Sequence, residues 1–260
     1  MTRLTLNSVS LQLGDAKIIR DVTVEFRSKE LTALVGANGA GKTSLLRCAA
    51  GIEQPTSGAA FLENAPLNTL TPVARARRIA YLPQTRGAAW PITVRDAVTL
   101  GRFAYGAPLH ETSGDDKVAV DRAIRQCGLA EIETRRIDTL SGGETARVYC
   151  ARAFATEAPV LLADEPIASL DPGGQLAIMS LIRAHADAGA GAVAILHDLQ
   201  LAARFADRMV WMRSGAVIAD GSPKETLTAQ TIADVFDVAS SIAWHDDLAQ
   251  VQFLEPIPSA

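Results

Sequence analysis

A glycine-rich segment between a short uncharged run and a helical pattern limits the possible folds of this chain more than any other feature. Residues 36–43 read GANGAGKT and match the pattern G-x-x-x-x-G-K-[ST]. The preceding run, residues 31–35, is typical of a strand buried in a parallel sheet, and residues 42–50 predict a helix that ends before Gly51. Strand, tight turn and helix in this order form a cradle for phosphate, because backbone N–H groups and the positive end of the helix dipole converge there.

The same segment supplies the side chains that nucleotide chemistry requires. Lys42 would reach the β- and γ-phosphates as a point charge, and Thr43 would offer its hydroxyl to Mg²⁺. A glycine-rich turn that matches by chance is the alternative, and the flanking strand and helix argue against it. The candidate nucleotide-binding residues are Gly36, Asn38, Gly39, Ala40, Gly41, Lys42, Thr43 and Ser44.

Two adjacent acids follow a second apolar run. Asp164 and Glu165 come directly after residues 160–163, which predict a buried strand. The carboxyl ends of parallel strands line the crevice where α/β proteins bind ligands. Asp164 is suited to hold Mg²⁺ and Glu165 to polarise an attacking water. An ordinary solvated strand exit is the alternative, and the upstream phosphate loop favours the metal site.

The remaining patterns indicate how these motifs are organised. Alternating apolar residues predict antiparallel strands over 4–13 and 22–26, and residues 78–82 and 192–196 predict further strands. Helices are predicted over residues 94–100, 116–127, 141–156, 175–188 and 228–236, with a hairpin that joins 209–212 to 217–219. We therefore predict an α/β fold with a phosphate-loop core and a mostly parallel sheet, an N-terminal antiparallel β subdomain and a helical insertion. The predicted parts are 1–90 with 159–222 for the core, 91–158 for the helical insertion and 223–260 for a C-terminal extension.

Composition narrows the class of protein. The net charge is −4 and the pI is about 5.6, which argues against a nucleic-acid partner. The three cysteines lack CxxC spacing, so neither a disulfide framework nor a zinc site is expected. The first residues lack the apolar stretch of a signal peptide, and uncharged apolar runs fall short of the ~18 residues that span a bilayer. We therefore expect any membrane role to be peripheral.

A third motif lies at the start of the predicted helix 141–156. Ser141 and Glu144 have the spacing of a capping box, which is a sufficient explanation for those two residues. Gly142 and Gly143 between them weaken the first turn of a helix. Two glycines there leave bare backbone N–H groups, which suits a site that a phosphate approaches closely.

With these motifs in this order, the sequence resembles the ATP-binding subunits of ABC transporters over nearly the whole chain. The resemblance makes residues 36–43 the phosphate loop and residues 140–144 the signature. It implies a RecA-like ATP-binding core, ATP and Mg²⁺ as cofactors, and hydrolysis of ATP to ADP and phosphate.

The resemblance also implies a role for each remaining landmark. Glu165, His197 and Lys42 would be catalytic, and the metal would lie at Thr43, Gln84 and Asp164. The signature residues Ser141, Gly142, Gly143 and Glu144 would act on the nucleotide of a second copy, and the loop with Ser169 and Asp171 would lie at the dimer interface. Taken singly, Gln84 could be an exposed loop residue, Asp171 a helix cap and His197 a strand-end histidine.

The implied protein is a head-to-tail homodimer that encloses two ATP molecules and drives a separate integral membrane permease. Within the family, the resemblance is to importers of iron chelates, haem and cobalamin. It is carried by residues 93–102, by His197 to Leu199 and by residues 221–223. The implied location is the cytoplasmic face of the inner membrane, with a periplasmic or extracellular substrate-binding protein as an indirect partner.

Three positions depart from the family pattern. Leu13 stands where an aromatic residue commonly stacks on adenine, which puts base stacking in question and predicts loose nucleotide selectivity. Ala146 replaces a common Gln after the signature, and Ile167 replaces a common Thr after the two acids. None of these residues is expected to touch phosphate or metal.

Two other functions are the alternatives. A soluble ABC ATPase of cluster assembly would share every motif and lack a permease. A P-loop kinase for a small metabolite would explain residues 36–43 and Asp164, but it leaves residues 141–144 and His197 without a role.

Overall fold

The computed structural model describes residues 2–84, 91–109, 112 and 114–257. Within these residues a six-stranded sheet has the order β10-β9-β3-β8-β7-β6. Its strands are β3 (Leu31–Gly36), β6 (Ile79–Leu82), β7 (Val160–Ala163), β8 (Gly191–Ile195), β9 (Arg208–Arg213) and β10 (Ala216–Gly221). All neighbours pair in parallel except β9 and β10, which form the predicted hairpin. The α/β class and the mostly parallel sheet are thereby confirmed.

A second sheet is antiparallel and comes from the N-terminal part of the chain. Its order is β2-β1-β4-β5, with β1 (Arg3–Leu13), β2 (Ala16–Arg27), β4 (Ser57–Leu62) and β5 (Ala65–Pro66). Alternate residues of β1, such as Leu4 and Leu6, are fully buried, as a half-buried strand requires. The antiparallel subdomain was predicted from this alternation, whereas β4 and β5 were not.

Helix α1 (Lys42–Ala49) joins the two sheets. Its residues Leu45 and Leu46 are buried in one cluster with Leu4 of β1 and Leu34 of β3. Because this cluster touches both sheets, the helix that carries the phosphate loop is held firmly from two sides.

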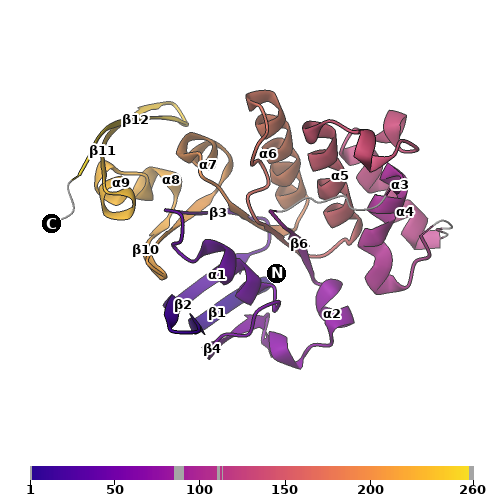
Figure 1. Cartoon of the computed structure of the whole chain (residues 1–260), viewed down its shortest axis with the longest axis horizontal. Coiled ribbons are helices and arrows are strands. Elements are labelled where there is room, and N and C mark those ends of the chain that lie inside the picture. Colours follow the sequence, from indigo (N-terminus) through magenta and orange to yellow (C-terminus); the bar gives the residue numbers. More distant parts are fainter. Residues whose placement is uncertain (1, 85–90, 110–111, 113, 258–260) are drawn as a thin grey trace.

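The predicted helical insertion gathers at one end of the molecule (Figure 1). It contains α3 (Val94–Thr99), α4 (Gly114–Gln126) and α5 (Gly142–Ala155), which share one apolar cluster with the face of the parallel sheet and with α6 (Pro172–Asp187). The helix expected over 94–100 ends at Thr99 and continues as a 3₁₀ segment, Leu100–Tyr105. Shorter elements are 3₁₀ turns at Leu67–Thr69, Ala130–Ile132 and Ile137–Thr139 and helix α2 (Pro72–Ala76).

One buried arginine anchors that 3₁₀ segment. Arg102 is 3% exposed and pairs with Asp116 at 2.8 Å and Glu157 at 3.0 Å. Its guanidinium lies 3.7 Å from the ring centroid of Tyr105. A buried charge needs such partners, so Arg102 ties the 3₁₀ segment to α4 and to the end of α5.

The C-terminal extension is only partly as predicted. The helix expected over 228–236 is present as α9 (Ala229–Phe236), preceded by α7 (Leu199–Phe205) and α8 (Pro223–Thr226). A hairpin of β11 (Val238–His245) and β12 (Leu248–Pro256) follows and was not predicted. Its inner face buries Ala249 and packs Trp244 against the main apolar cluster. The predicted boundary at residue 90 lies outside the described residues, so the division into 1–90, 91–158, 159–222 and 223–260 stays a prediction.

Candidate nucleotide-binding and hydrolytic site

The phosphate loop connects the end of β3 to the start of α1. Gly39 and Gly41 have φ values of 78° and 94°, a left-handed conformation that side chains rarely adopt. A Cβ at Gly36 would lie 2.2 Å from the carbonyl oxygen of Met212, so only glycine fits at the end of β3. The glycines of the motif are therefore required by the backbone path of the loop.

Lys42 turns its charge back into this loop. Its side chain is buried, and Nζ donates to the carbonyls of Gly36 at 2.7 Å and Ala37 at 2.9 Å. Burial lowers the pKa of Lys42, and the charges of Glu165 and Asp164 oppose that shift. Among the described residues Lys42 forms no ion pair, so its charge is available for an anionic ligand.

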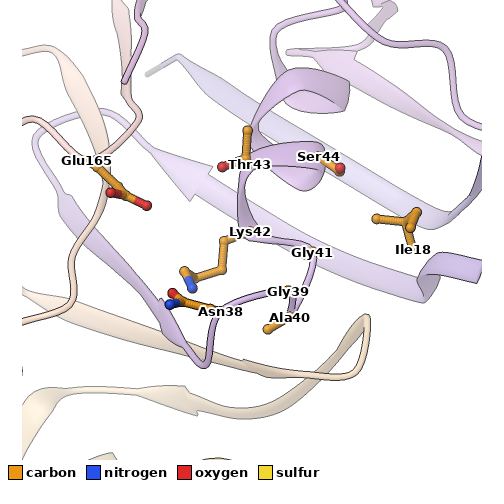
Figure 2. A pocket seen from close by; sticks show the side chains of 9 residues that line it. All are labelled: Ile18, Asn38, Gly39, Ala40, Gly41, Lys42, Thr43, Ser44 and Glu165. Carbon is orange, nitrogen blue, oxygen red and sulfur yellow. The ribbon is translucent and has the colours of Figure 1, made fainter. Parts of the chain in front are cut away.

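The loop borders a pocket of about 260 Å³. Its lining residues are Ile18, Asn38, Gly39, Ala40, Gly41, Lys42, Thr43, Ser44 and Glu165. Figure 2 shows the Glu165 carboxylate across the pocket from the loop, directed toward Lys42 and Thr43. Each of these residues except Ile18 was predicted from the sequence. Leu13, at the position where relatives commonly place an adenine-stacking aromatic, is 48% exposed at the end of β1 and does not line the pocket.

Asp164 lies at the carboxyl end of β7 and is 2% exposed. Its Oδ1 accepts a hydrogen bond from Thr43 Oγ1 at 3.0 Å, and its Oδ2 accepts one from Tyr81 Oη at 2.9 Å. Burial and the neighbouring Asp164 charge raise the pKa of Tyr81 to about 12, so the phenol remains a donor. Tyr81 was not predicted as a site residue, because its only signal in the sequence is its place on the predicted strand, three residues before Gln84.

Glu165 is held by residues from the two neighbouring strand ends. His197 Nε2 lies 2.9 Å from Oε1, and Gln84 Nε2 donates to Oε2 at 2.7 Å. Gln84, Glu165 and His197 follow β6, β7 and β8, which are adjacent and parallel. Glu165 also has a φ of 51°, an uncommon conformation for a residue with a side chain.

These oxygen atoms suit a hard divalent cation. Thr43 offers a hydroxyl and Asp164 a carboxylate, which are the ligand types that Mg²⁺ takes alongside phosphate and water. Gln84 donates its amide nitrogen to Glu165, which leaves its amide oxygen as the atom a metal could use. The donor set therefore fits Mg²⁺ beside a bound triphosphate.

The signature residues start helix α5. Ser141 caps the helix: its Oγ accepts from Glu144 N at 3.3 Å, and the Glu144 carboxylate accepts from Ser141 N at 2.8 Å. The capping box is thus present, but it explains only these two residues. A Cβ added at Gly142 or Gly143 would meet no atom within 4 Å, so this chain alone does not require glycine at either position.

The loop between β7 and α6 carries the two residues predicted for a dimer interface. Ser169 is exposed and has a φ of 62°. Asp171 is exposed as well, and its Oδ1 caps α6 by accepting from Gly174 N at 2.7 Å. The helix-cap role of Asp171 is therefore present, and it leaves the loop facing outward.

Residues 19–168 match the family model described as ABC transporter. The chain belongs to the ABC transporter family, as an ATP-binding subunit.

Relatives within the family include two import ATP-binding proteins and one transport ATP-binding protein. The chain is 38% identical over 240 residues to a cobalamin import ATP-binding protein of Halobacterium salinarum, covering 92% of this chain and 60% of that protein. It is 39% identical over 251 residues to a hemin import ATP-binding protein of Rhodopseudomonas palustris, with 92% of each chain covered. It is 34% identical over 239 residues to the achromobactin transport ATP-binding protein of Dickeya dadantii, covering 92% of this chain and 89% of the relative.

Solved structures share the fold. An ATP-binding cassette of an ABC transporter in its ADP conformation superposes with a TM-score of 0.82 at 22% identity, over 91% of this chain and 98% of that one. The cbiO1 component of the cbiONQ ABC transporter of Clostridium perfringens has a TM-score of 0.76 at 25% identity, over 89% and 92% of the two chains. Across the described part of this chain, no helix has both the length and the apolar character needed to cross a bilayer.

Proposed function

We propose that this chain is the ATP-hydrolysing subunit of an ABC importer, and that it converts ATP and water to ADP and phosphate. The observation that carries the proposal is the position of Glu165, which faces Lys42 across the pocket while Gln84 and His197 hold its two oxygens. A carboxylate held in this way can orient a water for attack on the γ-phosphate.

Each residue has a defined part in this mechanism. The loop N–H groups and Lys42 bind the β- and γ-phosphates, and His197 contacts the γ-phosphate. Thr43 and Asp164 would hold Mg²⁺, which supplies positive charge to the phosphate oxygens when bound. Glu165 accepts the hydrogen bond of the attacking water and aligns it with the γ-phosphorus.

A second copy of the chain would complete each site. Gly142 and Gly143 present open backbone that this chain does not use itself, which supports their approach to the γ-phosphate bound by a partner. Charge-assisted hydrogen bonds contribute ~1.5–3 kcal/mol each. Several at two sites offset an association cost of ~4–15 kcal/mol, so loss of the γ-phosphates would open the dimer.

The helical insertion offers a groove for the membrane permease. The groove has a volume of about 360 Å³ and runs between β6, the 3₁₀ segment Leu100–Tyr105 and α5. Phe103 at its rim is 77% exposed. Arg152 lines it and forms no ion pair within the described residues. The Arg152 guanidinium lies 4.8 Å from the ring centroid of Tyr149 and still lacks a carboxylate partner among the described residues. An exposed aromatic beside such an arginine suits an amphipathic segment that carries an acidic residue.

The relatives support a metal chelate as the transported substrate. Those reported above carry cobalamin, hemin and achromobactin in their names. We infer iron–siderophore, haem or cobalamin import, with a separate permease and a periplasmic or extracellular substrate-binding protein as partners. The chain would then lie on the cytoplasmic face of the inner membrane and associate with it peripherally.

Concentration dependence and co-purification test the proposal. ATPase activity that rises with the square of protein concentration supports the dimer, whereas linear activity on a small phosphate acceptor indicates a kinase. Co-purification with a multi-span membrane subunit supports the importer. Recovery with cluster-assembly proteins and without such a subunit would contradict it.

A further inference from the structure

The hydroxyl of Tyr81 is a contact of the metal site that the mechanism above does not use. It donates to Asp164 Oδ2 at 2.9 Å, while Thr43 donates to Oδ1 at 3.0 Å. Asp164 is 2% exposed, so bulk water does not replace a donor that is lost. The two donors bind different oxygens of one carboxylate, and together they fix the plane of that group.

We propose that Tyr81 is a positioning residue: its hydroxyl holds Asp164 in the orientation in which Oδ1 meets Thr43 and the metal. The terminal torsion of an aspartate is broad, so contacts to its oxygens decide its angle. Without the phenol, the carboxylate turns to find another donor for Oδ2, and Oδ1 moves with it. The inference rests on the proposed function, because it assumes that Thr43 and Asp164 hold Mg²⁺.

The backbone makes this contact a fixed property of the fold. Strand β6 pairs in parallel with β7, with Leu82 opposite Ala163. Asp164 N then donates to the Leu82 carbonyl at 2.8 Å, which extends the ladder to the acid. The ring of Tyr81 packs against the apolar cluster around α1. Strand register and ring packing therefore place the hydroxyl before any metal binds.

Tyr81 also lines the groove that we propose for the permease, beside Leu100 and Phe103. The Tyr81 side chain thus lines the groove and also contacts the carboxylate of the metal site. Only the hydroxyl of Tyr81 makes the contact to Asp164.

The test is Tyr81→Phe, which removes the hydroxyl and keeps the ring. Tyr105→Phe is a matched control, because Tyr105 Oη donates to the Thr156 carbonyl at 3.0 Å in the helical insertion. Two quantities are measured on the full chain: the affinity for a fluorescent ATP analogue in EDTA, and the affinity of the nucleotide-saturated protein for Mn²⁺ by electron paramagnetic resonance. Saturating nucleotide stabilises the native state, so a less stable variant can still be titrated.

We expect Tyr81→Phe to keep its nucleotide affinity in EDTA and to lose about tenfold in Mn²⁺ affinity, the effect of one hydrogen bond to a charged group. Tyr105→Phe should match the parent in both titrations. Equal Mn²⁺ affinity in Tyr81→Phe and in the parent would overturn the proposal. A loss of nucleotide affinity in EDTA as large as the loss of Mn²⁺ affinity would also overturn it, because such a loss indicates a packing role. A parent that binds nucleotide without any metal dependence would instead refute the proposed metal site.

Discussion

Glu165 Oε1 lies 2.9 Å from His197 Nε2, and this contact joins the ends of two adjacent parallel strands, β7 and β8. Gln84 holds the other oxygen from the next strand end. These two neighbours therefore fix the orientation of the Glu165 carboxylate. Replacing it by an amide of the same shape tests its role directly.

Glu165→Gln should bind ATP and fail to hydrolyse it. The amide keeps the shape of the side chain but is a poor base, so we expect a loss of ~10²–10⁴-fold in phosphate release. Size-exclusion chromatography with ATP should then show an accumulated dimer. Glu63→Gln, an exposed acid on the antiparallel sheet side, serves as the control. Normal hydrolysis by Glu165→Gln would show that another group aligns the water.

Lys42→Ala should lose nucleotide affinity. The charge of Lys42 is held by two carbonyls and by no carboxylate of the described residues, so phosphate is its natural counter-charge. Loss of a charge-assisted contact costs ~1.5–3 kcal/mol, or about tenfold or more in Kd for ATP. Titration calorimetry measures this, with Lys117→Ala, which removes an exposed lysine of α4, as the control. Unchanged affinity would refute the phosphate loop.

Gly143→Ala should separate stability from activity. The added methyl meets no atom of this chain within 4 Å, and alanine favours a helix by up to ~1 kcal/mol over glycine. The melting temperature should therefore hold or rise, whereas ATPase activity should fall because the methyl obstructs a phosphate from the partner. Retained activity at a raised melting temperature would exclude close approach of a phosphate to this turn.

The stability of the chain should fall in mild acid because of His185. Burial lowers its pKa from 6.5 to about 4, and its ring stacks on Phe154 at a centroid distance of 4.3 Å. Between these two values the unfolded chain binds a proton that the folded chain does not, so stability falls as pH falls, by ~1.4 kcal/mol per unit at most.

His185→Phe keeps a stacked ring and removes that titration. Urea unfolding at several pH values from neutral to mildly acidic should show a shallower loss of stability than in the parent. His245→Phe, on the exposed hairpin, is the matched control for replacing a histidine by phenylalanine. An identical slope in His185→Phe would assign the acid sensitivity to other groups.

Leu13→Tyr should strengthen purine nucleotide binding. Leu13 is half-exposed at the end of β1, so a larger ring can be accommodated there. Stacking on a base contributes ~1–3 kcal/mol, which predicts an affinity gain of about fivefold or more. Fluorescence titration with ATP and GTP measures the gain, and the parent should discriminate little between the two. An unchanged Kd would show that the base lies elsewhere, for instance against Ile18.

The sequence by itself determined the order of the motifs and the class of fold. Residues 36–43 need particular glycines because the loop requires left-handed backbone at Gly39 and Gly41. Such local requirements select residue types that can be recognised from the sequence alone. The alternation along β1 and the apolar runs of β3 and β7 likewise reflect local burial.

The tertiary structure alone decided which residues from distant segments meet. Gln84, Glu165 and His197 converge because β6, β7 and β8 are neighbours in the sheet, and pairing between strands carries no local signature. Tyr81 and Ile18 escaped prediction for the same reason, since an ordinary strand residue acquires a role only from what lies across from it. The hairpin β11–β12 was missed because its strands are largely exposed, and only packing against α7 and α9 gives its weak apolar alternation a face to bury.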